Sequence, residues 1–85
     1  MDLKTEFETA VGEAKNLLAQ SNENLLKLYG LFKQATEGDI TIEKPSNMFD
    51  FKGIAKYNAW EELKGISRED AMKRYIETVK ELGSQ

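Results

Sequence analysis

Apolar residues recur three and four positions apart in four stretches of the chain, and this spacing predicts four helices and an all-α fold. The first stretch, near residues 3–19, gathers its apolar side chains on one face: Phe7, Ala10, Val11, Ala14, Leu17 and Leu18. A single proline and few runs of β-branched residues agree with a helical chain.

A second helix is predicted to begin after Ser21–Asn22, whose side-chain oxygens can cap free backbone amides, and to end near Glu37. Gly38 is a natural stop there, because glycine accepts the backbone conformation that ends many helices. Residues 38–51 follow no helical period and include the only proline, Pro45, so we predict a long connector.

The third helix is predicted to begin after Asp50 and to end near Leu63, before Gly65. Ser67–Asp70 has the pattern of a capping box and opens a fourth helix. That helix turns six side chains inward: Ala71, Met72, Tyr75, Ile76, Val79 and Leu82. The short links make the first and second helices antiparallel, and likewise the third and fourth. The long connector lets the third helix run parallel to the second, so we predict a four-helix bundle.

Composition narrows the function classes. A chain of 85 residues holds one domain, here 1–85. There is no cysteine and no histidine, which removes disulfides, the usual nucleophile, the usual general base and the two best zinc ligands. The adjacent carboxylates Glu61–Glu62 and Glu69–Asp70 point apart on helices and support neither a hydrolase nor a metal cage. We predict no catalytic residue, no metal and no enzyme.

The charge balance bears on partners and location. Twelve basic and fifteen acidic residues give a net charge of −3, which argues against nucleic-acid binding but allows one anionic ligand held by local lysines. The start, Met1–Lys4, lacks the pattern of a signal peptide, and no stretch approaches the roughly 18 apolar residues that cross a bilayer. We predict a cytoplasmic protein without stable membrane insertion.

The second helix carries two neighbouring rows of side chains. One is a plain core stripe: Leu25, Leu28, Phe32 and Ala35. The other runs from Leu26 through Tyr29 to Lys33, from apolar through phenol to ammonium. Such a row suits the wall of a groove whose ligand is greasy at one end and anionic at the other. On spacing alone we favour the simpler interpretation, in which Tyr29 lies at the edge of the core and Lys33 reaches water, because such pairs are common.

The predicted third helix repeats this theme. Lys52 and Lys56 are four positions apart and project from one face, near a helix N-terminus where the backbone dipole favours an anion. On this spacing alone, a solvated basic face is the favoured interpretation. Trp60 is most simply a core residue with its indole N–H at the boundary.

Two blocks of sequence resemble a known family. Leu28–Asp39 contains a tyrosine, three residues, then Lys-Gln-Ala-Thr and Gly-Asp, which resembles the signature of the acyl-CoA-binding protein family. Asp50–Trp60 is similar to the second block of that family, and Glu62–Gly65 and Glu69–Met72 continue the likeness. The chain departs from the usual pattern at Phe32 and Tyr57, where tyrosine and tryptophan are more common, and in a connector one residue longer.

The resemblance implies an up-down-down-up four-helix bundle that binds medium- to long-chain acyl-CoA esters. It implies a carrier and pool former for fatty-acyl-CoA transport, without chemical change. The ligand-binding positions expected with it are Lys15, Leu26, Tyr29, Gly30, Leu31, Phe32, Lys33, Lys52, Lys56 and Tyr75. By the same resemblance, Tyr29, Lys33 and Lys56 hold the 3′-phosphate of CoA and Phe32 borders the adenine. Tyr75 and Leu26 line the path of the pantetheine and acyl chain.

A rival interpretation is a helical protein-interaction module that kept the fold and lost the ligand. Such a module has no reason to retain Tyr29, Lys33 and Lys56 together, so their joint presence favours the carrier. The expected partners are acyl-CoA esters and the enzymes that make or use them, and the expected state is a monomer. No cofactor is expected beyond the ligand itself.

Overall fold

The computed structural model describes residues 2–84 and contains four helices within them. They are α1 (Leu3–Ala14), α2 (Asn22–Glu37), α3 (Phe51–Glu61) and α4 (Arg68–Gly83). Met1 and Gln85, the two ends of the predicted domain, lie outside the described residues. The prediction of an all-α chain of four helices is confirmed.

Polar side chains begin the helices as the sequence predicts. The Ser21 hydroxyl accepts a hydrogen bond from a backbone N–H of α2, and the Ser67 hydroxyl does the same for α4. The Asp50 carboxylate accepts from the N–H of Gly53 at 3.0 Å and caps α3. Each cap satisfies an amide that has no partner within its own helix, which sets where the helix starts.

The first helix is shorter than predicted: it ends at Ala14 rather than Ala19. Asn16 and Leu17 donate their backbone N–H groups to carbonyls three residues earlier, so the chain tightens into a turn. Leu17 still packs against the core, but Leu18 is 80% exposed, so its predicted place on the inward face is wrong. The apolar spacing continues past the end of the helix into a turn, where Leu17 contacts the core and Leu18 does not.

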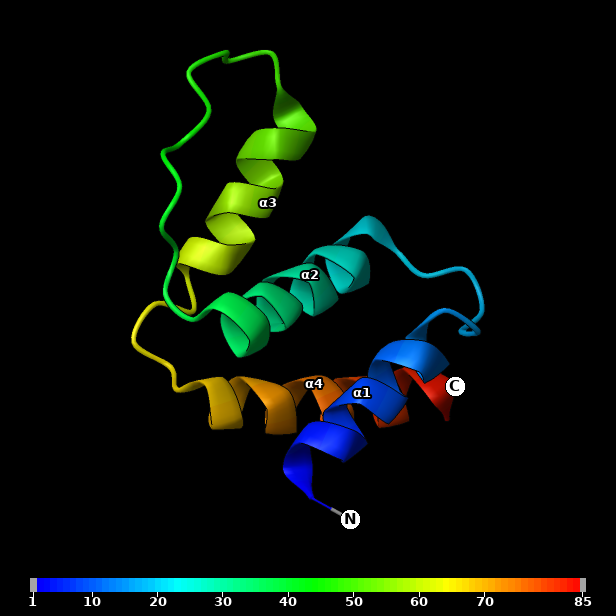
Figure 1. Ribbon diagram of the computed structural model, residues 1–85. Coiled ribbons are helices and arrows are strands. Elements are labelled where there is room, and N and C mark those ends of the chain that lie inside the picture. The colour runs from blue at the N-terminus through cyan, green and yellow to red at the C-terminus, as the bar shows by residue number, and fades with distance from the viewer. Residues whose placement is uncertain (1, 85) are drawn as a thin grey trace.

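The second helix is the centre of the fold (Figure 1). It packs against α4 on one side and α3 on the other, while α1 packs against α4. Both α2 and α3 end on the same side of the molecule, and α4 starts there and runs back, in agreement with the predicted direction of the helices. Within residues 2–84, α2 is the only helix that α3 packs against, so α3 forms an arm of the bundle.

The hydrophobic core lies where α1, α2 and α4 meet. Its buried residues are Phe7, Ala10, Leu28, Leu31, Ala35, Ala71, Tyr75, Ile76, Val79 and Leu82. Leu25, predicted to share the core stripe, is 52% exposed, so that prediction is wrong. The reason is visible in Figure 1: toward its N-terminus α2 rises away from α1 and α4. Leu25 therefore has no core to enter, although its spacing from Leu28 is right.

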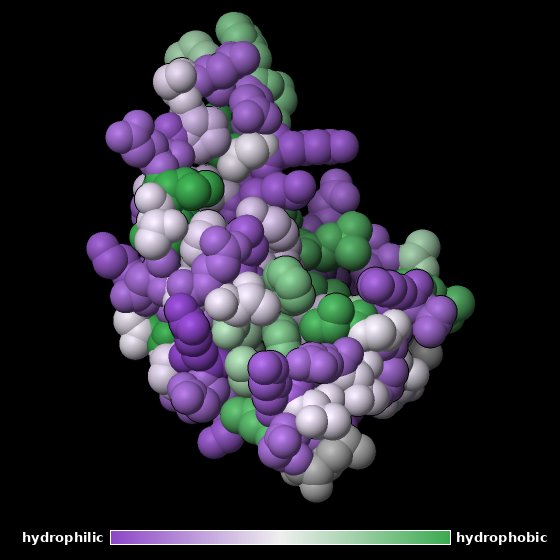
Figure 2. Space-filling view, in the orientation of Figure 1, coloured by the Kyte–Doolittle hydropathy of each residue, from purple (hydrophilic) through white to green (hydrophobic). Residues whose placement is uncertain are grey.

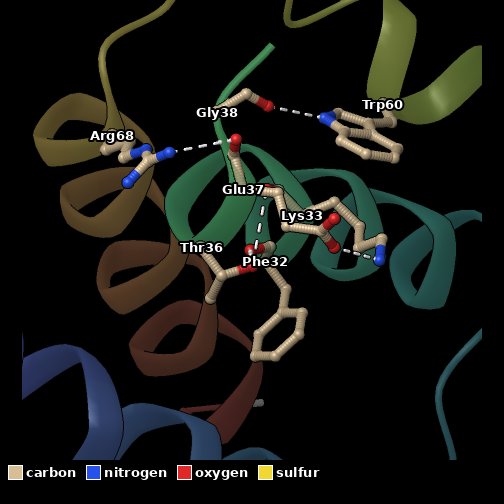
Figure 3. A network of polar contacts seen from close by, with 7 residues as sticks. All are labelled: Phe32, Lys33, Thr36, Glu37, Gly38, Trp60 and Arg68. Carbon is tan, nitrogen blue, oxygen red and sulfur yellow. Dashed lines mark hydrogen bonds and ion pairs between the residues drawn. The ribbon is translucent and has the colours of Figure 1, made fainter. Parts of the chain in front are cut away.

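The end of α2 is tied to the following elements by its own signature residues (Figure 3). The Trp60 indole N–H donates to the Gly38 carbonyl at 2.9 Å, and Arg68 donates to the Glu37 carbonyl at 3.1 Å. The Asp39 carboxylate accepts from the Gly65 N–H and from the Gln34 amide, both at 2.8 Å. These bonds hold the end of α3 and the start of α4 against the end of α2. Within residues 2–84, no helix is long and apolar enough to cross a membrane.

Candidate functional site

A groove of ≈ 430 Å³ opens between α2 and α3. It is lined by Asn22, Leu25, Leu26, Tyr29, Phe51, Lys52, Ala55 and Lys56. The space-filling view shows apolar and hydrophilic surface side by side where the α3 arm stands away from the body (Figure 2). One wall, on α2, is mostly apolar, and the facing turns of α3 supply two ammonium groups.

The two walls meet at Tyr29 and Lys56. The Lys56 ammonium lies 5.4 Å from the centre of the Tyr29 ring, within the range of a cation–π contact. Lys52 lies one turn earlier on the same face of α3 and lines the same groove. Two ammonium groups so close repel each other mildly, and an anion between them would remove that repulsion. The structure thus brings together Leu26, Tyr29 and both of these lysines.

Lys33 lies one turn beyond Tyr29 on α2 and has two partners (Figure 3). Its ammonium forms an ion pair with Glu37 and lies 5.1 Å from the centre of the Trp60 ring. The hydrogen bond to Glu37 raises the pKa of Lys33 above its ordinary value, so this lysine stays charged at neutral pH. An incoming anion would therefore meet a charged Lys33 that is held by a neighbouring carboxylate.

Phe32 and Tyr75 lie in an aromatic cluster on another side of α2. Their ring centres are 6.5 Å apart, and Phe7 of α1 lies 6.1 Å from Phe32 and 5.1 Å from Tyr75. Tyr75 is buried, which raises the pKa of its phenol, whereas Phe32 is 37% exposed. Phe32 is thus an edge of the core rather than its full member. Figure 3 shows its ring pointing away from α2 in a different direction from Lys33.

The remaining predicted positions lie outside the groove lining. Leu31 is buried in the core, and Lys15 is exposed directly after the end of α1. Gly30 is buried where α2 and α3 touch: a Cβ added there would lie 2.6 Å from the Ala59 carbonyl oxygen. Its lack of a side chain lets the two helices approach closely. Gly30 therefore affects the groove through the distance between α2 and α3, the two helices that form its walls.

Four groove residues were missed by the sequence reasoning: Asn22, Leu25, Phe51 and Ala55. A usable signal existed for Phe51 and Ala55, since they flank Lys52 and Lys56 on the same side of a helix. Leu25 carried the opposite signal, because its spacing from Leu28 is that of a core residue. Within residues 2–84, no three acidic, histidine or cysteine side chains group closely enough to hold a metal ion.

A helical fold with a groove that combines apolar side chains with two lysines indicates a class: a helical protein suited to an amphipathic anion. A family model described as "Acyl CoA binding protein" matches residues 4–79, most of the chain. The chain therefore belongs to the acyl-CoA-binding protein family, as its signature residues indicated.

Individual proteins agree with this membership. The acyl-CoA-binding protein homolog 1 of Caenorhabditis elegans is 52% identical over 77 residues, which cover 89% of this chain and 88% of the relative. The acyl-CoA-binding protein of Brassica napus is 48% identical over 83 residues, 96% of this chain and 89% of the relative. The crystal structure of Oryza sativa acyl-CoA-binding protein 2 superposes with a TM-score of 0.90 at 45% identity, covering 95% of this chain and 90% of that one.

Proposed function

We propose that this protein binds medium- to long-chain acyl-CoA esters and serves as their intracellular carrier and pool former. The observation that carries the proposal is the pairing of Lys52 and Lys56 on α3 with Leu26 and Tyr29 on α2 across one groove. A CoA ester is anionic at its phosphates and apolar along its acyl chain, so it matches both walls of this groove. The names of the relatives support the same ligand.

The basic residues are proposed to hold the phosphates. Tyr29, Lys33 and Lys56 take the 3′-phosphate. Lys52, one helical turn before Lys56, and Lys15, at the end of α1, are proposed as further ligands of the head group. Each charge-assisted hydrogen bond to phosphate contributes roughly 1.5–3 kcal/mol. The Tyr29 hydroxyl and the Lys56 ammonium can reach one phosphate together, because the ammonium lies 5.4 Å from the Tyr29 ring centre.

The apolar residues are proposed to contact the rest of the ligand. Leu26, together with Leu25 and Phe51, offers partly exposed apolar surface to the pantetheine and acyl chain. Each buried methylene adds about 0.8 kcal/mol, so affinity should rise with chain length until the groove is filled. Phe32 borders the adenine with its exposed edge. Tyr75, whose ring centre lies 6.5 Å from that of Phe32, lines the path of the pantetheine and acyl chain. Gly30 and Leu31 act through packing, since both are buried.

The carrier interpretation requires no chemistry on the thioester. We propose a monomer in the cytoplasm that exchanges ligand with acyl-CoA-producing and acyl-CoA-consuming enzymes. A module specialised for protein contacts is not favoured, because it gives no reason for Tyr29 and Lys56 to face each other across a groove. The absence of cysteine agrees with a reducing compartment.

Calorimetric titration tests the proposal. Palmitoyl-CoA should bind far more tightly than free CoA or free palmitate, because the lysines contact the head group and separate apolar residues contact the acyl chain. Lys56→Met keeps the apolar stem and removes the charge, so it should weaken every acyl-CoA by about 1.5–3 kcal/mol, whatever the chain length. Lys73→Met, an exposed lysine of α4 away from the groove, is the control and should bind like the wild type.

Two results would contradict this assignment. If palmitate bound as well as palmitoyl-CoA, the protein would be a general fatty-acid carrier. If Lys56→Met and Lys73→Met lost the same affinity, the effect would come from net charge rather than from a phosphate site in the groove.

A further inference from the structure

The far end of the α3 arm exposes large apolar side chains. Met48, Phe49 and Phe51 are 71%, 76% and 73% exposed, and we call these three residues the apolar tip. The connector and the start of α3 form the part of the molecule that stands furthest from α1 and α4 (Figure 1), and apolar surface appears there in Figure 2. Soluble proteins rarely leave such side chains together on the surface unless something covers them.

The tip is held by an ordered turn. The Asn47 side-chain oxygen accepts from the Phe49 N–H at 2.9 Å, and its carbonyl accepts from the Asp50 N–H at 3.0 Å. The Asp50 carboxylate in turn caps α3. The turn is therefore held by hydrogen bonds while Met48, Phe49 and Phe51 stay exposed. Phe49 and Met48 are outside the α2–α3 groove, whereas Phe51 belongs to both surfaces and Lys52, next to it in the chain, lines the groove.

The charge around the tip differs in sign from the rest of the chain. Residues 40–57 contain three lysines and two carboxylates, Glu43 and Asp50, so this segment has a net charge of +1. The whole chain carries −3. Lys44 precedes the apolar tip and Lys52 follows it, and both are exposed. The Asp50 carboxylate is engaged by the helix it caps.

We propose that the apolar tip docks onto the surface of an anionic lipid bilayer. The tip is convex and protrudes, so it suits insertion among headgroups better than a fit into a rigid partner. Phenylalanine and methionine beside lysine are side chains that enter the interface while their charged neighbours stay at anionic headgroups. Because Phe51 and Lys52 also line the groove, docking would bring the groove mouth to the surface from which an amphipathic ester leaves. The docking itself does not depend on the proposed ligand.

Vesicle co-sedimentation of the full chain without acyl-CoA tests this. Vesicles of phosphatidylcholine mixed with phosphatidylserine should retain wild-type protein reversibly, and more weakly as salt is raised. Met48→Ser with Phe49→Ser should lower the bound-to-free ratio by about tenfold, as expected when two apolar side chains no longer enter the interface. Leu18→Ser is the matched control, because Leu18 is 80% exposed in the α1–α2 turn, away from the tip. It should bind vesicles like the wild type.

The other outcomes decide against the proposal. It is overturned if the wild type binds no vesicles, or if the control loses as much binding as the tip variant. Sedimentation equilibrium without lipid provides a further check: a dimer that the tip variant abolishes would assign the tip to a second copy of this chain instead. Calorimetry with palmitoyl-CoA on the tip variant keeps the two proposals separate, since its affinity should equal that of the wild type whatever the vesicles show.

Discussion

Gly30→Ala is the substitution on which the structure makes its sharpest prediction. In α2 alone it should stabilise, since alanine is the better helix former by about 1 kcal/mol. In the protein the new Cβ would lie 2.6 Å from the Ala59 carbonyl oxygen and 2.9 Å from the carbonyl carbon, with the Leu63 side chain at 3.3 Å. The closest atoms belong to the backbone of α3, so no side chain can turn aside to make room.

The net magnitude follows from two opposed terms. Pressing an extra carbon into a close contact costs typically about 1–3 kcal/mol, against roughly 1 kcal/mol gained in helix propensity. We expect Gly30→Ala to lower the free energy of unfolding by up to about 2 kcal/mol, a large share of the margin of so small a domain. Gly12→Ala on α1 is the control: Gly12 is exposed and a Cβ there meets nothing within 4 Å. It should stabilise by about 0.5–1 kcal/mol.

Urea denaturation followed by circular dichroism measures both variants, and calorimetry with palmitoyl-CoA measures the groove. If α3 moves to relieve the contact, Lys56 moves away from Tyr29, and ligand affinity should fall in Gly30→Ala but not in Gly12→Ala. The reasoning is refuted if the two alanine variants gain the same stability. In that case α2 and α3 would not approach as closely as their backbones indicate.

Three further predictions concern single groups. Tyr29→Phe should leave folding nearly unchanged and weaken acyl-CoA binding by roughly 1.5–3 kcal/mol, an effect that calorimetry should find absent with 3′-dephospho-CoA esters. Glu37→Gln should tighten acyl-CoA binding by about 0.2–1 kcal/mol, because the phosphate no longer competes with the Glu37 carboxylate for Lys33. Weaker binding would show that Lys33 needs Glu37 to position it. The hydrogen bond from the Gly65 N–H lowers the pKa of Asp39, so its stabilisation is present above its unfolded pKa and is lost as pH falls through the folded value. The urea midpoint of the wild type should therefore drop more between about pH 5 and pH 3 than that of Asp39→Asn, and parallel curves would exclude this role.

Much of the local structure could be predicted from the sequence because its causes span only a few residues. Ser21, Asp50 and Ser67 cap helices through bonds to an amide three positions on. Gly38 ends α2 with a φ of 81°, a conformation that glycine adopts readily. The row of Leu26, Tyr29 and Lys33 was also readable, since helical spacing alone decides which side chains share a face.

Other residues were misread because their surroundings come from distant parts of the chain. Leu25 has core spacing but lies where α2 leaves α4, and Leu18 follows a helix that ends earlier than its apolar pattern. The sequence around Leu18 and Leu25 does not show whether another element packs against them. Burial depends on that partner, and helix spacing specifies only the direction of a side chain.

The candidate site divides in the same way. That Tyr29 and Lys33 share one face of α2, and Lys52 and Lys56 one face of α3, was determined by the sequence through helical geometry. That these faces oppose each other across a groove was decided by the tertiary structure. Gly30 admits the backbone of α3, and the signature residues at the end of α2 hold α3 and α4 through bonds that span more than 20 positions of the chain. Such contacts depend on three-dimensional proximity, which no local pattern of residues records.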